Sequence, residues 1–132
     1  MLTGTFQLTT GSKMELIDIS EKVNTIIHEN AVSSGVCYLF NPHTTAGLTI
    51  NEGADPDVCD DILKGLTHMV PQDLHYRHLE GNSPAHIMSS LIGTSLVVHA
   101  ANSKVQLGTW QKIFFCEFDG PRTRKVHWKI IK

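Results

Sequence analysis

The sequence has few cysteines and no long apolar run. Its three cysteines, Cys37, Cys59 and Cys116, are far apart, and no Cys-x-x-Cys pair occurs among the 132 residues. An odd number at this spacing argues against a disulfide framework and a thiolate zinc site, so we expect three buried, reduced packing residues. No apolar stretch approaches the roughly 20 residues of a membrane span. The N-terminal residues also lack the charged and apolar regions of a signal peptide, so we expect a cytoplasmic protein.

Charge of either sign is also scarce. Charged residues make up 18% of the chain and its net charge is −2, so we expect no nucleic acid and no membrane as partners. The sequence contains no Walker loop, dinucleotide fingerprint or Gly-x-Ser-x-Gly elbow, which removes support for common nucleotide-binding and hydrolase classes. With 41% apolar residues, the chain suits a single globular domain over residues 1–132.

Hydrophobic periodicity predicts many strands, with helices inserted in the first two thirds of the chain. Strands are expected near residues 2–10, 14–19, 36–41, 45–51, 94–100, 112–119 and 123–131, the first two forming a hairpin. Helices are expected to begin at Ile19, Pro56 and Pro84, the last with Ser83 as its N-cap, and to end near Gly35, Pro71 and Gly93. The fold class is therefore α+β: a single compact domain with a largely antiparallel sheet or sandwich and two to three helices.

Three histidines lie at the boundaries of predicted elements, where side chains can converge on a site. His43 follows a strand, His78 lies in a polar loop, and His86 falls in the first turn of the third helix. Three imidazoles with an open fourth position are a common catalytic zinc site, although three unrelated loop histidines would give the same pattern. Glu52 and Glu80 stand beside these histidines and are the candidate acid–base residues.

Other polar residues could hold phosphate. Backbone N–H groups near Asn82 and Ser83, at the start of the third helix, could bind an anion, and Arg122 could supply positive charge. Arg122, Arg124 and Lys125 form a small basic cluster that could bind a phosphate or could equally be a solvated strand end. Gly108-Thr109 could form a second cradle. Glu117 lies in a strand that otherwise looks buried, so its carboxylate either pairs with a cation or contributes to a site.

Several segments taken together resemble the YjbQ-like family, which is described as secondary thiamine-phosphate synthases. The segments are His43–Glu52, Asp55-Pro56, His78, Glu80–Asn82, Ala85-His86, Leu91–Ser95, Leu107–Gln111 and Glu117–Arg122. The resemblance covers nearly the whole chain in the expected order. It implies an α+β subunit, usually a homotrimer, with a metal-associated histidine cluster at His43, His78 and His86.

The resemblance also implies a reaction, in which hydroxymethylpyrimidine diphosphate and thiazole phosphate give thiamine phosphate and pyrophosphate. We expect a divalent metal, with zinc favoured by imidazole ligands and magnesium possible beside a diphosphate. The expected substrate-binding residues are Asn51, Asn82, Ser83, Thr109, Trp110, Gln111 and Arg122. Trp110 could stack on a heterocycle, or could equally be a core or subunit-interface residue. A zinc-dependent phosphate-ester hydrolase and a non-catalytic trimer that binds a metal or metabolite remain the alternatives.

Overall fold

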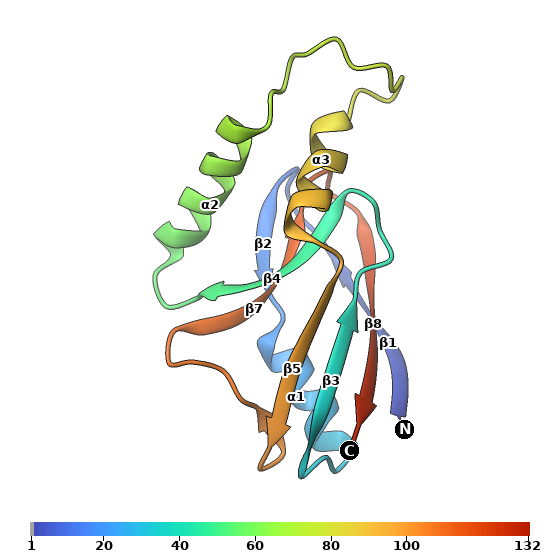
Figure 1. Cartoon of the computed structure of the whole chain (residues 1–132), viewed down its shortest axis with the longest axis vertical. Helices are drawn as coiled ribbons and strands as arrows, with labels where there is room; N and C mark the ends of the chain where they lie inside the picture. The colour runs from blue at the N-terminus through green and yellow to red at the C-terminus, as the bar shows by residue number, and fades with distance from the viewer. Residues whose placement is uncertain (1) are drawn as a thin grey trace.

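The computed structural model describes residues 2–132, which form two antiparallel sheets and three helices (Figure 1). The strands are β1 (Leu2–Thr9), β2 (Glu15–Asp18), β3 (Ser34–Phe40), β4 (Ala46–Glu52), β5 (Ser95–Ala101), β6 (Lys104–Val105), β7 (Gln111–Glu117) and β8 (Thr123–Ile131). The helices are α1 (Ser20–Glu29), α2 (Pro56–Met69) and α3 (Ser83–Ile92). The predicted α+β class is confirmed. The two-residue strand β6 was not predicted.

The first two strands do not form the predicted hairpin. β1 pairs with β8 at the edge of a five-stranded sheet of order β1-β8-β3-β5-β6, whereas β2 pairs with β7 in a three-stranded sheet of order β2-β7-β4. The chain passes from one sheet to the other between residues 10 and 14, where Thr10 N–H donates to Arg122 O and Gly120 N–H donates to Lys13 O. Alternating side chains identify a strand but not its partner, so the hairpin prediction was wrong.

The three-stranded sheet lies between two apolar layers. One face packs with α1 and the inner face of the five-stranded sheet, and this core includes Ile27, Leu39 and Phe115. The other face packs beneath α2 and α3, around Met88 and Phe118. β7 is therefore covered on both faces and is the central strand of its sheet, as its continuous apolar run predicted.

The helix boundaries follow local chemistry in most places. The Asp55 side chain accepts a hydrogen bond from Asp57 N–H, and Pro56 takes the first helical position of α2. Gly93 ends α3 with φ +96°, a value that favours glycine. The prediction that Gly35 ends α1 was wrong. The helix already ends at Glu29, and Gly35 lies inside β3. The N-cap of α3 is Asn82 rather than Ser83, and no side chain caps the helix.

The cysteines are free and mostly enclosed. Cys37 and Cys116 are buried, and Cys59 is partly exposed, so the prediction of full burial fails only for Cys59. Burial raises the pKa of Cys37 to about 11 and that of Cys116 to about 12. Both thiols therefore stay protonated at neutral pH. None of the helices in residues 2–132 is long and apolar enough to cross a membrane.

Candidate functional site

A polar pocket of about 360 Å³ lies where the β3–β4 loop, the loop before α3 and the start of β8 meet. Its lining includes six residues predicted from the sequence: His43, His78, Glu80, Asn82, His86 and Arg122. Four further residues complete it: Pro42, Thr44, Thr45 and Arg124. We call this set of ten residues the histidine pocket. Segments separated by about 80 residues in sequence thus supply one cavity.

Asn41 shapes the loop that carries His43. Its buried side chain accepts a hydrogen bond from His43 N–H at 3.0 Å and donates to Ala46 O at 2.8 Å. Asparagine favours such local side-chain-to-backbone bonds, which hold a turn in one conformation. The loop is also tied to α3, because Ser89 Oγ donates to Ala46 O at 2.6 Å. His43 therefore projects from a fixed turn rather than from a mobile one.

The His43 ring is held by a backbone donor. Lys125 N–H donates to His43 Nε2 at 2.8 Å, so a neutral His43 carries its proton on Nδ1. Burial lowers the pKa of His43, and repulsion from Arg124 lowers it further, whereas Glu117 raises it. The net shift is downward, which favours the neutral ring at physiological pH. His43 thus offers the pocket a hydrogen-bond donor.

His78 and His86 lie together in the lining of the pocket. Their ring centroids are 5.2 Å apart, with the rings nearly perpendicular at 83°. His86 is placed by the first turn of α3, and His78 is exposed in the preceding loop. Glu80, also exposed, lines the pocket and accepts a hydrogen bond from Asn82 Nδ2 at 3.4 Å. His78 and Glu80 are therefore accessible to solvent.

One pocket residue, Arg124, belongs to a buried ion pair with Glu117. Glu117 is fully buried and Arg124 is 3% exposed. Arg124 Nε lies 2.9 Å and 3.2 Å from the two Glu117 carboxylate oxygens, and Nη2 bonds both the carboxylate and Thr45 Oγ1. Burial by itself raises the pKa of Glu117, but hydrogen bonds from Arg124 and Thr10 outweigh it, so the net pKa is lowered. The pair is therefore ionised at neutral pH.

A second, more exposed ion pair joins another pocket residue, Arg122, to Asp119. Arg122 Nη2 bonds Asp119 Oδ2 at 2.9 Å, and Arg122 Nε donates to Asp119 O at 2.7 Å. Asp119 Oδ2 also accepts from Asn82 Nδ2 at 2.8 Å. Desolvation raises the pKa of Asp119, but the bonds from Asn82 and Arg122 outweigh it and lower the pKa overall. Asp119 thereby links the loop before α3 to the start of β8.

The N-terminus of α3 offers little to an anion. Pro84 has no N–H, and the N–H groups of Ala85 and His86 already donate to Asn82 O at 3.0 Å and 3.4 Å. Ser83 lies outside the histidine pocket, in a shallow depression with Tyr76, His78, His86 and Ile87. Positive charge near the pocket therefore comes from the two arginines rather than from the helix end.

The three histidines meet only part of the requirement for a metal site. With zinc–nitrogen bonds of about 2.1 Å and tetrahedral angles, two imidazoles on one ion have centroids about 5 Å apart, as His78 and His86 do. His43 differs, since its Nε2 is bonded to Lys125 N–H and its Nδ1 carries the proton. Across residues 2–132, no group of three His, Cys, Asp or Glu side chains is arranged to hold a metal ion. As placed, the three-histidine set does not fit a metal.

Five of the predicted site residues lie elsewhere in the subunit. Asn51 and Glu52 are at the far end of β4, where Glu52 pairs with Gln111 at the start of β7. Thr109 and Trp110 lie in the adjoining turn, and Trp110 O accepts from Gly53 N–H. A strand of seven residues spans about 20 Å, which separates this end of β4 from the histidine pocket. Trp110 is 63% exposed, so it is not a core residue.

Sequence reasoning offered Arg124 only as part of a basic cluster with Arg122 and Lys125, without placing it beside the histidines. It missed Thr45 and Asn41. A signal for Arg124 was present, because strand side chains alternate and Val126 and Ile130 were correctly predicted to face inward along β8. Arg124 has the same parity and therefore faces inward too. Glu117 was expected to need a cation if it did not belong to a site, and Arg124 is that cation. Asn41 gave no such signal, because its role depends on the turn that it forms.

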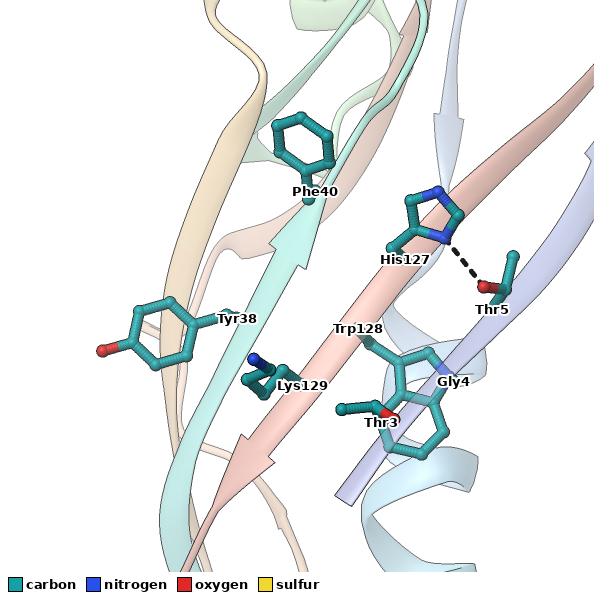
Figure 2. Close-up of a pocket in the computed structure, with 8 residues that line it drawn as sticks. All are labelled: Thr3, Gly4, Thr5, Tyr38, Phe40, His127, Trp128 and Lys129. Carbon is teal, nitrogen blue, oxygen red and sulfur yellow. Dashed lines mark hydrogen bonds between the residues drawn. The ribbon is translucent and has the colours of Figure 1, made fainter. Parts of the chain in front are cut away.

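The outer face of the five-stranded sheet carries a second, apolar hollow, of about 540 Å³. Figure 2 shows its lining side chains projecting from β1, β3 and β8, with His127 bonded to Thr5 at 2.7 Å. Tyr38 and Phe40, 43% and 47% exposed, stand on β3, and Val97 and Ile131 extend the apolar surface over β5 and β8. Lys125, His127 and Lys129 face outward on β8, as the alternation predicted.

Comparison with known proteins gives one consistent family. The model of the family described as UPF0047 protein YjbQ-like matches residues 4–132. A UPF0047 protein of Methanocaldococcus jannaschii is 49% identical over 126 residues, covering 96% of this chain and 91% of the relative. YugU of Bacillus subtilis is 46% identical over 128 residues, covering 96% and 97%.

Solved structures agree with this. A YjbQ/UPF0047 family protein of Clostridium acetobutylicum superposes with a TM-score of 0.93 at 51% identity, covering 96% of this chain and 98% of that one. A conserved hypothetical protein of Thermus thermophilus gives a TM-score of 0.91 at 40% identity, covering 97% and 99%. On its sequence and its fold alike, the chain belongs to the YjbQ-like UPF0047 family.

Proposed function

We propose that the histidine pocket binds a phosphorylated small molecule and that the protein is an enzyme acting on it. One observation carries this proposal: both arginines of the pocket are anchored through Nε and Nη2. Asp119 holds Arg122 in this way, and Glu117 holds Arg124. Among the described residues, neither Nη1 has a hydrogen-bond partner, which leaves two fixed guanidinium donors for a ligand. Arginine in such an arrangement suits phosphate oxygens.

The reaction that we propose is the synthesis of thiamine phosphate from hydroxymethylpyrimidine diphosphate and thiazole phosphate. Departure of pyrophosphate develops negative charge, which prepositioned cationic donors stabilise. Arg122 and Arg124 would contact the departing phosphates, and the neutral His43 would donate from Nδ1. Glu80 lines the pocket, is exposed to solvent, and is the proposed acid–base group. The two substrates come from the family resemblance. The two arginines, each held by a carboxylate, support the binding of the substrates' phosphate groups.

A divalent metal is a separate proposal. His78 and His86 are the residues that we propose as its protein contacts, with zinc favoured by imidazole nitrogen. His43 is left out of this set because its Nε2 accepts from Lys125 N–H and its Nδ1 carries the proton. Magnesium could instead enter with a diphosphate substrate. A bound metal would polarise phosphate oxygens.

We also propose that the protein is a homotrimer in the cytoplasm. The supporting observation is the outer face of the five-stranded sheet, where Tyr38, Phe40, Val97 and Ile131 are each at least 43% exposed. A contiguous apolar surface of this kind is typical of a subunit interface. Light scattering of the wild type and of Phe40→Glu tests this. A trimer that becomes monomeric in the variant supports the proposal, and a monomeric wild type overturns it.

Incubation of purified protein with both substrates and a divalent metal tests the reaction. We expect thiamine phosphate, and we expect Arg124→Gln and His86→Ala to reduce its formation at least tenfold. His28→Ala, an exposed substitution on α1, is the matched control and should leave the rate unchanged. No product above a His43, His78 and His86→Ala triple variant would contradict the proposal. Hydrolysis of phosphate esters instead would favour the hydrolase, and binding without turnover would favour a non-catalytic protein.

A further inference from the structure

A trimer needs two different contact surfaces on each subunit. In a ring of three copies, one surface of each copy meets a different surface of the next, whereas a surface that meets itself gives a dimer. The apolar hollow on the outer face of the five-stranded sheet, whose lining includes Tyr38, Phe40 and His127, is one such surface (Figure 2). Its volume of about 540 Å³ is large enough for an aromatic side chain. The hollow must therefore meet a surface that lies elsewhere on the next copy.

The turn before β7 carries an exposed tryptophan. Trp110 is 63% exposed, and its carbonyl oxygen accepts from Gly53 N–H at 2.9 Å. The turn is closed by Gln111 N–H, which donates to Gly108 O at 3.0 Å. Because these bonds already order the turn, little conformational entropy would be lost when it docks. Tryptophan is also enriched among the residues that contribute most of the binding energy of interfaces, so Trp110 is suited to anchor a subunit contact.

The charges around the hollow and around the turn are complementary. Among residues 2–132, no strand of the five-stranded sheet contains Asp or Glu, and Lys125 and Lys129 are exposed on its outer face. The charged residues beside the turn are three acids against one lysine: Glu52, Asp55, Asp57 and Lys112. Opposite charges across an interface favour the correct partner and fix its orientation. The acidic end that carries Trp110 thus suits the basic face around the hollow.

The hollow adjoins the histidine pocket. Phe40 and His127, which line the hollow, are paired across β3 and β8, and their ring centroids are 6.5 Å apart. Pro42 lies two residues beyond Phe40, and Arg124 lies three residues before His127, and both line the histidine pocket. At about 3.3 Å per residue, the two cavities lie within about 10 Å of each other. A segment docked in the hollow would therefore have its neighbouring residues at the pocket.

We propose that, in the trimer proposed above, the hollow of each subunit receives Trp110 of the next, which brings Gln111 to the neighbouring histidine pocket. Within one subunit, Gln111 pairs with Glu52 at the far end of β4, about 20 Å from the pocket. Gln111 Oε1 accepts from Gly108 N–H at 2.8 Å, which orients its amide group. The amide nitrogen is then a donor for a ligand in the pocket of the adjacent copy. Each site is thus formed by two subunits and is incomplete in one.

Cross-linking between engineered cysteines tests this arrangement. Thr44→Cys, in the lining of the histidine pocket, and Gln111→Cys change exposed residues, and both would be made in a Cys59→Ser chain to remove the partly exposed native thiol. Thr44 precedes β4 and Gln111 pairs with its last residue, so within one subunit the two are about 20 Å apart, beyond the reach of a short bismaleimide. We expect covalent dimers and trimers on a denaturing gel. The matched control combines Gln111→Cys with His68→Cys, exposed on α2, and should give only monomers on the gel.

Replacing Trp110 by alanine tests the anchor separately. The variant trimer should dissociate at a concentration at least tenfold higher than the wild type, because it lacks the side chain that fills the hollow. Met69→Ala removes an apolar side chain of similar exposure, 68%, from α2. It touches neither the turn nor the hollow and should leave the dissociation midpoint unchanged. Light scattering over a dilution series measures both midpoints.

The shared site is refuted if a protein that light scattering shows to be trimeric gives no covalent dimer or trimer. It is also refuted if the control pair cross-links equally well, or if Trp110→Ala dissociates at the same concentration as the wild type. A monomeric wild type would overturn this contact together with the proposed trimer. A failure to form thiamine phosphate would leave all of these measurements unchanged, so the contact and the reaction can fail separately.

Discussion

Replacing Glu117 by glutamine should destabilise the protein strongly, because it removes the partner of a buried charge. The side chains of Glu117 and Arg124 are 0% and 4% exposed, and both Nε and Nη2 of Arg124 bond the Glu117 carboxylate. Glutamine keeps one oxygen acceptor but leaves the guanidinium charge uncompensated. Removing one member of a buried pair costs about 3–5 kcal/mol. The total stability of a domain is about 5–15 kcal/mol, so the variant would fold but would be marginal.

Thermal unfolding followed by circular dichroism, at one protein concentration, measures this effect. An unfolding entropy of about 2.1 cal/mol/K per residue gives about 0.28 kcal/mol/K for a chain of 132 residues. The melting temperature should therefore fall by about 11–18 °C. The matched control is Arg122→Gln, which breaks an ion pair whose arginine side chain is 49% exposed. Exposed pairs contribute about 0–1 kcal/mol, so its melting temperature should fall by at most about 4 °C.

The same ion pair makes the stability of the folded protein depend on pH. The pKa of Glu117 is lowered in the folded protein, so its stabilisation is fully present above the unfolded pKa of about 4.3. It is lost as the pH falls through the lower, folded pKa. The difference between wild type and Glu117→Gln should thus be constant from pH 5 to pH 7 and should shrink below about pH 4. A loss under 1 kcal/mol at pH 7, or a difference that already shrinks above pH 5, would refute the assignment of a buried ionised pair.

Two further predictions concern the thiols and the proposed metal. In native protein, iodoacetamide at pH 8 should modify Cys59 first, because Cys37 and Cys116 are buried and their pKa values are raised to about 11 and 12. Equal labelling of all three thiols before unfolding would contradict the burial of Cys37 and Cys116. In calorimetric titration with Zn²⁺, His86→Ala should lose binding at least tenfold, whereas His43→Ala should retain it within about threefold, because His43 keeps no free lone pair. Equal losses in the two variants would show that His43 turns away from Lys125 to become a ligand.

Much of the fold could be predicted from local patterns. The Pro56 start and Pro71 stop of α2 and the Gly93 end of α3 follow from backbone chemistry that acts within a few residues. The alternation in β8 gave the correct inward and outward faces. Strand partners were not predictable in this way: the apolar faces of β1 and β2 are compatible with pairing to each other, but the chain between them crosses from one sheet to the other.

The sequence by itself determined the family, the α+β class and six members of the histidine pocket, because these depend on motifs and on short-range periodicity. Only the tertiary structure decided which residues meet. It brings Arg124 and Thr45 into the pocket. It leaves Glu52 and Trp110 at the far end of β4, because a strand rises about 3.3 Å per residue and so carries its last residues away from the pocket. It also decided the state of His43, whose free lone pair is taken by a backbone N–H 82 residues away. Spacing in a sequence can propose a metal ligand, but the hydrogen bonds of the folded chain decide whether its nitrogen is available.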